Sequence, residues 1–170
     1  MIGQALESAR EGEASTAQIA LLEDAERVGE VTLEHAHEAA LNAVQCMTEA
    51  GVSASYVLYT VQGLDIPGYE AHVGLEDNSK LEALADRCDT KEFQWISQVY
   101  QTQPAATEAH AQHFVESVPL IRACLESHGV RVDADATADE IEQAMTQALT
   151  DSAGDVNCFT VLDGGDPAKG

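Results

Sequence analysis

The chain has 170 residues and a formal net charge of −22, because 30 Asp and Glu residues are set against only 8 Lys and Arg residues. This length suffices for one ordinary domain with a buried core and is marginal for two. Binding to nucleic acid or to an anionic membrane requires clustered bases, and the eight bases are scattered, so the composition excludes both as expected partners. Aromatic residues make up 5% of the chain, which predicts a core built mainly from Ala, Leu, Val and Ile.

Three interpretations of the acidity stay open. Dense carboxylates are typical of a halophilic cytoplasm or virion, where molar salt screens their repulsion within about 3 Å. The second interpretation is a mimic of the phosphate backbone that occupies the basic groove of a DNA-binding enzyme, and the third is ordinary acidity. The acids are spread along the chain and interleaved with alanine, and no Lys or Arg lies between Arg27 and Lys80, which favours salt adaptation.

We expect a cytoplasmic or virion-associated protein that is not secreted. No stretch approaches the ~18 to 20 apolar residues of a spanning helix, and the N-terminus carries acids where a signal peptide carries bases and then apolar residues. The cysteines are far apart and form no CxxC pair, so we expect reduced, structural thiols. They are Cys46, Cys88, Cys124 and Cys158.

The first half of the chain predicts helices followed by a hairpin. Residues 1–28 read as a helical arm in two pieces, 2–10 and 17–28, with Ser15 or Thr16 capping the second piece. Thr32 opens a stronger helix that ends at Gly51. Its apolar positions recur at helical spacing and are expected to be buried. They are Leu33, Ala36, Ala40, Leu41, Val44 and Met47.

The rest of the chain predicts further strands and helices. Residues 54–62 and 69–75 are expected to pair as a hairpin around a turn at 63–68. Asn78 or Ser79 caps a short helix, which is followed by a third strand at 92–100 and a last strand at 156–162. A long helix at 105–128 contains Pro119, which predicts a kink or a break. Residues 130–132 form a brief extended piece, and Thr137 with Glu140 forms a capping box.

These elements predict an α+β fold. Its sheet is small, mixed or antiparallel, with about 3–4 strands, and amphipathic helices pack on it. The predicted organisation is an N-terminal helical arm at 1–28, a single α+β domain at 29–162 and a flexible tail at 163–170.

Two pairs of side chains are candidate metal ligands. Glu34 and His37 are i, i+3 neighbours on one predicted helix, as are His110 and His113 on another, so each pair could reach one ion. A di-iron bundle needs two Glu-x-x-His helices, and Thr107 occupies the Glu position before His110. A structural role for His37, in line with Leu33 and Leu41, is the alternative. The sequence lacks nucleophile and phosphate-loop motifs, and no cofactor is expected.

Two family resemblances accompany this pattern. The order of elements from Tyr56 to Phe114 resembles a GIY-YIG nuclease, with Val57-Leu58-Tyr59 and His72-Val73-Gly74 in the motif positions and Glu108 as metal-binding acid. The family's Gly and first catalytic Tyr are altered, and Arg87 comes later than its helical Arg. A Tyr-Val-x-Tyr strand after an N-terminal helix, with the run from Trp95 to Tyr100 into a later helix, is similar to tail-completion or neck proteins of tailed viruses.

The leading hypothesis is a non-enzymatic interaction or assembly protein of a salt-adapted system, such as a virion, tail or neck component. Its expected partners are other protein subunits, in a homo- or hetero-oligomer, without direct nucleic-acid or membrane binding. The alternatives are an acidic mimic that inhibits a DNA-binding enzyme, and a metal-dependent enzyme that uses the Glu and His residues named above.

Overall fold

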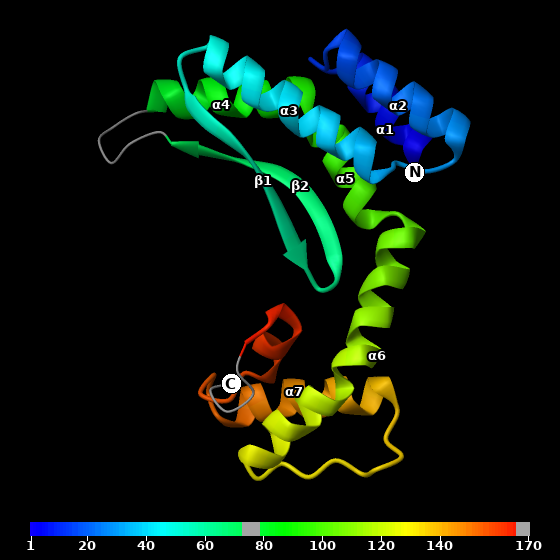
Figure 1. The fold of residues 1–170 in the computed structure, drawn as a ribbon, viewed down its shortest axis with the longest axis vertical. Helices are drawn as coiled ribbons and strands as arrows, with labels where there is room; N and C mark the ends of the chain where they lie inside the picture. Colours follow the sequence, from blue (N-terminus) through cyan, green and yellow to red (C-terminus); the bar gives the residue numbers. More distant parts are fainter. Residues whose placement is uncertain (73–78, 166–170) are drawn as a thin grey trace. The chain divides into compact units, whose positions relative to one another are not determined.

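The computed structural model describes residues 1–72 and 79–165 of the chain (Figure 1). Most of these residues are helical, and the only sheet among them is one antiparallel pair of strands. The elements are α1 (Ile2–Glu11), α2 (Thr16–Val28), α3 (Leu33–Glu49), β1 (Ser53–Val61), β2 (Leu64–His72), α4 (Ser79–Glu92), α5 (Gln94–Thr102), α6 (Pro104–Ser127), α7 (Ala138–Asp151) and the 3₁₀-helix η1 (Cys158–Asp163). The predicted α+β class is confirmed, but the described part of the chain has two strands where three or four were expected.

The described chain groups into two compact units. Unit 1 comprises residues 1–59 and 65–107, and unit 2 comprises residues 60–64 and 108–170. Within unit 1, α1 and α2 contact each other, α1 contacts α5, and α2 contacts α3, α4 and α5. The single Trp and all four Tyr residues belong to unit 1. The domain organisation inferred from the sequence stays a prediction.

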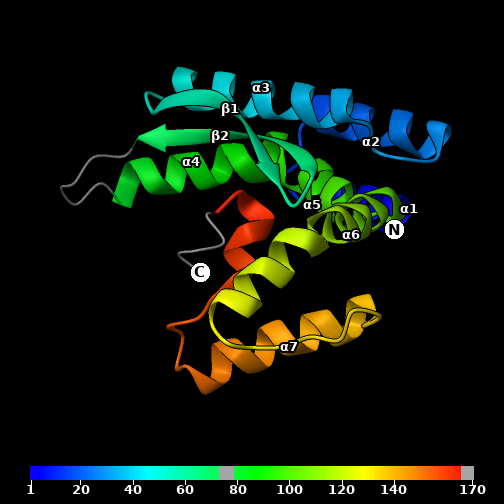
Figure 2. The ribbon, with the colours of Figure 1, turned by 60° about the horizontal axis from the view of Figure 1, so that its bottom comes forward.

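The hairpin turns over two residues, Gln62 and Gly63, which have φ values of 47° and 78°. Two central residues with positive φ suit the twist of a two-residue hairpin, and glycine adopts such a conformation without steric cost. The hairpin lies along α3 and α4 (Figure 2), where Ala54 and Ala71 pack against the core around Met47. The predicted hairpin is confirmed, but its turn has two residues where six were expected at 63–68, so residues 64–68 belong to β2. The predicted strand residues beyond His72 lie outside the described residues.

The predicted strand at 92–100 is wrong, because this segment contains the last residue of α4 and most of α5. Ile96, Val99 and Tyr100 are spaced three and four residues apart, and all three are buried on one helical face. The start of α5 is fixed from another helix, since the backbone N–H of Trp95 donates to Oε1 of Gln18 at 2.8 Å. A contact 77 residues apart decides this element, and local β propensity does not.

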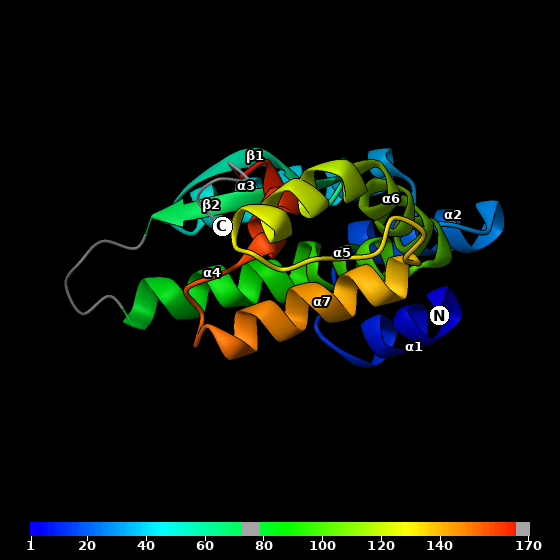
Figure 3. The same cartoon turned by 90° about the horizontal axis from the view of Figure 1, so that it is seen from below.

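In unit 2, the C-terminal part of α6, α7 and η1 surround one apolar core (Figure 3). Its largest buried side chains are Ile121, Leu125, Ile141 and Met145. Helix α6 continues through Pro119, so the predicted break does not occur. The capping box that begins α7 is confirmed, with the Thr137 side chain accepting from the Glu140 backbone and the Glu140 side chain accepting from the Thr137 backbone.

The last predicted strand, at 156–162, is wrong. This segment contains most of η1, and the Asn157 side chain accepts the backbone N–H of Phe159 at its start. The brief extended piece predicted at 130–132 lies in the connection between α6 and α7, outside any helix or sheet. The Arg122 guanidinium donates to carbonyls of this connection, those of Val132 at 3.3 Å and Asp133 at 2.7 Å. Side-chain to backbone hydrogen bonds therefore stabilise the backbone in both places.

Candidate interaction surface

The buried face of α3 is built almost entirely from alanine. Its buried residues are His35, Ala36, Ala39, Ala40, Ala43 and Met47. Leu33 and Leu41, which the sequence pattern placed in the core, are instead 44% and 43% exposed. Small side chains at the contact let neighbouring elements approach α3 closely, and the two leucines lie beside this contact on the exposed side of the helix.

Leu33, His37 and Leu41 stand four residues apart and therefore form one line along the exposed face of α3. The ring of His37 meets that of Tyr56 on β1 edge-on, with ring centroids 4.7 Å apart. Leu58 lies two residues further along the same face of β1 and is 48% exposed. We call these five side chains, Leu33, His37, Leu41, Tyr56 and Leu58, the α3–β1 strip.

The carboxylates beside the α3–β1 strip are exposed and unpaired. Glu34 and Glu38 lie next to Leu33 and His37 in the sequence, on the exposed side of α3. The ion pairs of the described residues join other groups, so neither carboxylate has a cationic partner within 4.0 Å there. The whole segment from residue 28 to residue 79 contains no Lys or Arg. The strip is therefore apolar in its middle and negatively charged at its margin.

Helix α3 is anchored at its start by a buried histidine. The backbone N–H of Thr32 donates to Nδ1 of His35 at 3.1 Å, and the His35 backbone N–H donates to Oγ1 of Thr32 at 3.3 Å. Nδ1 accepts, so Nε2 carries the proton and donates to Asp24 at 3.1 Å. The pKa of the Asp24 carboxyl is lowered by its hydrogen bond to Arg27 and then by the one to His35.

The hairpin is held on α4 by a tyrosine and an aspartate. The Tyr69 hydroxyl donates to Oδ1 of Asp89 at 2.6 Å, and its ring meets that of Phe93 edge-on at 5.7 Å. Burial and then the Asp89 carboxyl raise the pKa of Tyr69 above its usual range. Burial also raises the pKa of Asp89, with a further contribution from Asp86, while the bond from Tyr69 opposes that rise. This pair fixes the strand that lies beside β1.

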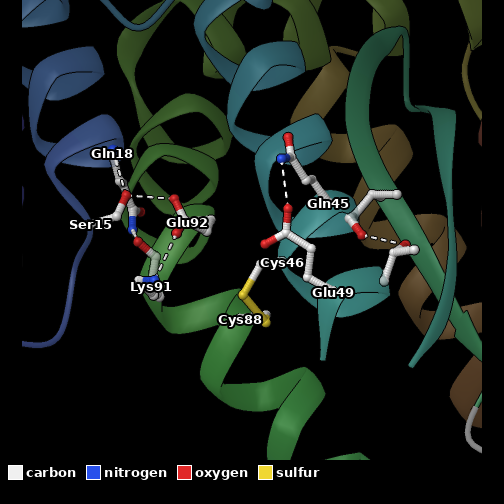
Figure 4. Close-up of a disulfide and its surroundings, with 10 residues drawn as sticks. Ser15, Gln18, Gln45, Cys46, Glu49, Cys88, Lys91 and Glu92 are labelled. Atoms are coloured by element: carbon white, nitrogen blue, oxygen red, sulfur yellow. Dashed lines mark hydrogen bonds and ion pairs between the residues drawn. A yellow bond between two sulfur atoms is a disulfide. The ribbon is translucent and has the colours of Figure 1, made fainter. Parts of the chain in front are cut away.

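A disulfide joins the C-terminal part of α3 to α4, between Cys46 and Cys88 (Figure 4). A second disulfide, between Cys124 and Cys158, lies in the core of unit 2. The expectation of reduced thiols is therefore wrong. The paired cysteines are 42 and 34 residues apart in the sequence, so only the tertiary fold brings them together. Their spacing along the chain therefore does not predict the pairing.

The candidate metal residues fall in two places. Glu34 and His37 lie in unit 1, beside and within the α3–β1 strip, whereas His110 and His113 lie in unit 2. His110 donates from Nδ1 to the Gln62 carbonyl at 3.1 Å, and His113 donates from Nε2 to the Leu162 carbonyl at 2.7 Å. Within residues 1–72 and 79–165, no group of three His, Cys, Asp or Glu residues is arranged to hold an ion. Metal binding by these residues stays a prediction.

Among the described helices, none combines the length and the apolar character needed to cross a bilayer. The chain matches no protein-family model, no curated protein and no solved structure. Function is therefore inferred from the chemistry of the described surface. The sequence pattern indicated Glu34 and His37 only as candidate metal ligands, and it missed the strip because it placed Leu33 and Leu41 in the core.

Proposed function

We propose that this chain is a non-enzymatic interaction or assembly protein of a salt-adapted system, and that the α3–β1 strip binds another protein subunit. The supporting observation is that Leu33, Leu41 and Leu58 are each 43% to 48% exposed, on either side of the ring contact that joins His37 of α3 to Tyr56 of β1. Single exposed apolar residues are common, but a contiguous group rimmed by polar residues is typical of a protein-binding site.

The acid excess supports the salt-adapted part of the proposal. Thirty carboxylic side chains against eight bases leave strong self-repulsion in dilute buffer, which molar salt screens. The two disulfides favour a virion or another oxidising setting over a reducing cytoplasm, since disulfides persist where thiols are not kept reduced. A virion component is therefore the more specific form of this proposal.

The proposal is tested by the mass of the assembly. We expect light scattering after size exclusion in molar KCl to give a complex larger than the monomer, either alone or after mixing with an extract of its source. The variant Leu33→Ser/Leu41→Ser should lose the complex. Leu120→Ser is the matched control, because Leu120 is 51% exposed on α6, away from the strip in the sequence. A monomer in molar KCl, both alone and after mixing with the extract, contradicts the proposal.

A further inference from the structure

We propose that the partner of the α3–β1 strip is a basic amphipathic helix, with leucine-like residues on one face and Lys or Arg residues along the margins of that face. This inference rests on the proposed function and adds the chemistry of the partner.

The spacing of the apolar side chains suits a helix. Leu33, His37 and Leu41 form a ridge with a side chain on every turn of α3, and Tyr56 and Leu58 form a second row on β1. A partner helix with apolar residues three and four positions apart can pack along such rows. The buried, alanine-lined side of α3 holds the ridge in place, because Ala36, Ala39, Ala40 and Ala43 are 0% to 1% exposed.

The charge around the strip selects the partner. Glu34 and Glu38 are exposed and have no cationic partner among the described residues, and no base occurs from residue 28 to residue 79. A Lys or Arg beside the partner's apolar face would lie against these carboxylates with its aliphatic stem over the leucines. Charge complementarity at the margin gives specificity, and apolar burial gives most of the affinity.

The same charges disfavour the other possible occupants. A second copy of α3 would bring its own Glu34 and Glu38 to the contact and would offer no base, so the carboxylates of the two copies would repel each other. Nucleic acid would place phosphates against the same carboxylates. A basic amphipathic protein segment satisfies both the apolar ridge and its acidic margin.

The test uses the full-length protein and two synthetic helical peptides in calorimetric titrations. Both peptides carry leucines three and four residues apart, and they differ only in having Lys or Gln at the margins of the leucine face. We expect the Lys peptide to bind more tightly in dilute buffer and to keep a smaller advantage over the Gln peptide in molar KCl, because only charges separated by more than the Debye length of about 3 Å are largely screened. Leu41→Ser should weaken the binding of both peptides about tenfold.

Matched variants separate local from general electrostatic attraction. Glu34→Gln/Glu38→Gln should weaken the Lys peptide about fivefold and leave the Gln peptide unchanged. Glu126→Gln/Glu142→Gln changes the net charge equally at exposed sites of unit 2 and should have little effect. Circular dichroism confirms that each variant folds.

The outcomes separate this inference from the proposed function. Equal binding of the two peptides in dilute buffer, with loss on Leu41→Ser, overturns the basic partner and leaves the strip as a binding surface. The inference is also overturned if both Glu→Gln double variants weaken binding of the Lys peptide equally, because the attraction would then come from the overall charge. Absence of binding by either peptide overturns it too, and the mass measurement with Leu33→Ser/Leu41→Ser then decides the proposed function independently.

Discussion

Gln18 joins three helices through a single buried amide. Its Nε2 donates to the carbonyls of Thr90 at 3.0 Å and Lys91 at 2.7 Å near the end of α4, and its Oε1 accepts from the backbone N–H of Trp95 in the first turn of α5. Ser15 adds a bond of 2.5 Å from its hydroxyl to Oε2 of Glu92 (Figure 4). The side chain of Gln18 is completely buried, and the Lys91 carbonyl also accepts from the backbone N–H of Ser15 at 2.8 Å, whereas the Trp95 N–H depends on Gln18.

We therefore expect Gln18→Ala to lower the free energy of unfolding by about 2 kcal/mol, because the Thr90 carbonyl and the Trp95 N–H lose the amide that bridges them. Urea denaturation followed by circular dichroism measures the change. Gln98→Ala, at an exposed position of α5, is the control and should cost much less. Equal effects of the two substitutions would show that the amide does not hold the junction between α4 and α5.

Tyr69 makes the stability of unit 1 sensitive to alkali. Its pKa in the folded state is raised, by burial first, above the ordinary value of 10.0. The stabilisation is therefore complete below pH 10.0 and is lost as the pH rises from there toward the folded-state pKa, since the unfolded chain releases this proton first. We expect the urea midpoint to fall as the pH rises above 10.0, and we expect this fall to be less steep in Tyr69→Phe.

Tyr59→Phe is the matched control for this titration, because Tyr59 is 39% exposed and its ring lies against Gly68. In Tyr69→Phe the urea midpoint should still fall somewhat in alkali, since burial also raises the pKa of Tyr100. An unchanged slope in Tyr69→Phe, together with a reduced one in Tyr59→Phe, would reverse the assignment.

The capping box of α7 makes the stability of this helix depend on pH in the acid range. The backbone N–H and hydroxyl of Thr137 donate to the Glu140 carboxylate and lower the pKa of Glu140 below its usual value of 4.5. The Glu140 carboxylate therefore contributes fully to the free energy of unfolding above pH 4.5, and this contribution is lost as the pH falls through the folded-state pKa. Thr137→Ala should lower stability by about 1 kcal/mol near neutral pH and by less in acid, measured from urea midpoints at several pH values.

The control for the cap is Thr146→Ala, at an exposed position within α7 where no terminal N–H needs a partner. Thr has a lower helix propensity than Ala, so this substitution should be neutral or slightly stabilising. A loss of stability in Thr146→Ala equal to that in Thr137→Ala would remove the cap as the explanation.

Helices with local signals were predictable from the sequence, and those fixed by distant contacts were not. Ser15, Thr32 and Thr137 mark helix starts through their own side chains, and each caps as predicted. The helix around Ile96 depends on Gln18, and η1 includes a cysteine bonded 34 residues away, so both were mistaken for strands. Likewise Leu33 and Leu41 are exposed because alanines fill the contact, which hydrophobicity alone does not reveal.

The acid excess predicts a salt-dependent fold for the entire chain. With a formal net charge of −22, we expect the urea midpoint to rise between dilute buffer and molar KCl, as screening shortens the reach of like-charge repulsion to about 3 Å. Glu126→Lys/Glu142→Lys should flatten this dependence. A protein that is equally stable in dilute buffer would contradict salt adaptation.

Each disulfide stabilises its own unit, because both of its cysteines lie there. We expect Cys46→Ser/Cys88→Ser to lower the stability of unit 1 by about 3 kcal/mol and to leave unit 2 unchanged, with the reverse for Cys124→Ser/Cys158→Ser. Hydrogen exchange resolved by peptide measures both units at once, and each pair of substitutions is the control for the other. Equal loss of protection in both units would contradict this independence.

The uneven distribution of aromatic rings determines how unfolding can be followed. Trp95 and all four tyrosines belong to unit 1, whereas unit 2 contains only phenylalanines among its aromatic residues. Thermal unfolding followed by intrinsic fluorescence or by near-ultraviolet absorbance therefore reports on unit 1 and gives almost no signal from unit 2. A tryptophan introduced in place of Phe114 or Phe159, which pack against the core of unit 2, would give that unit an optical signal of its own.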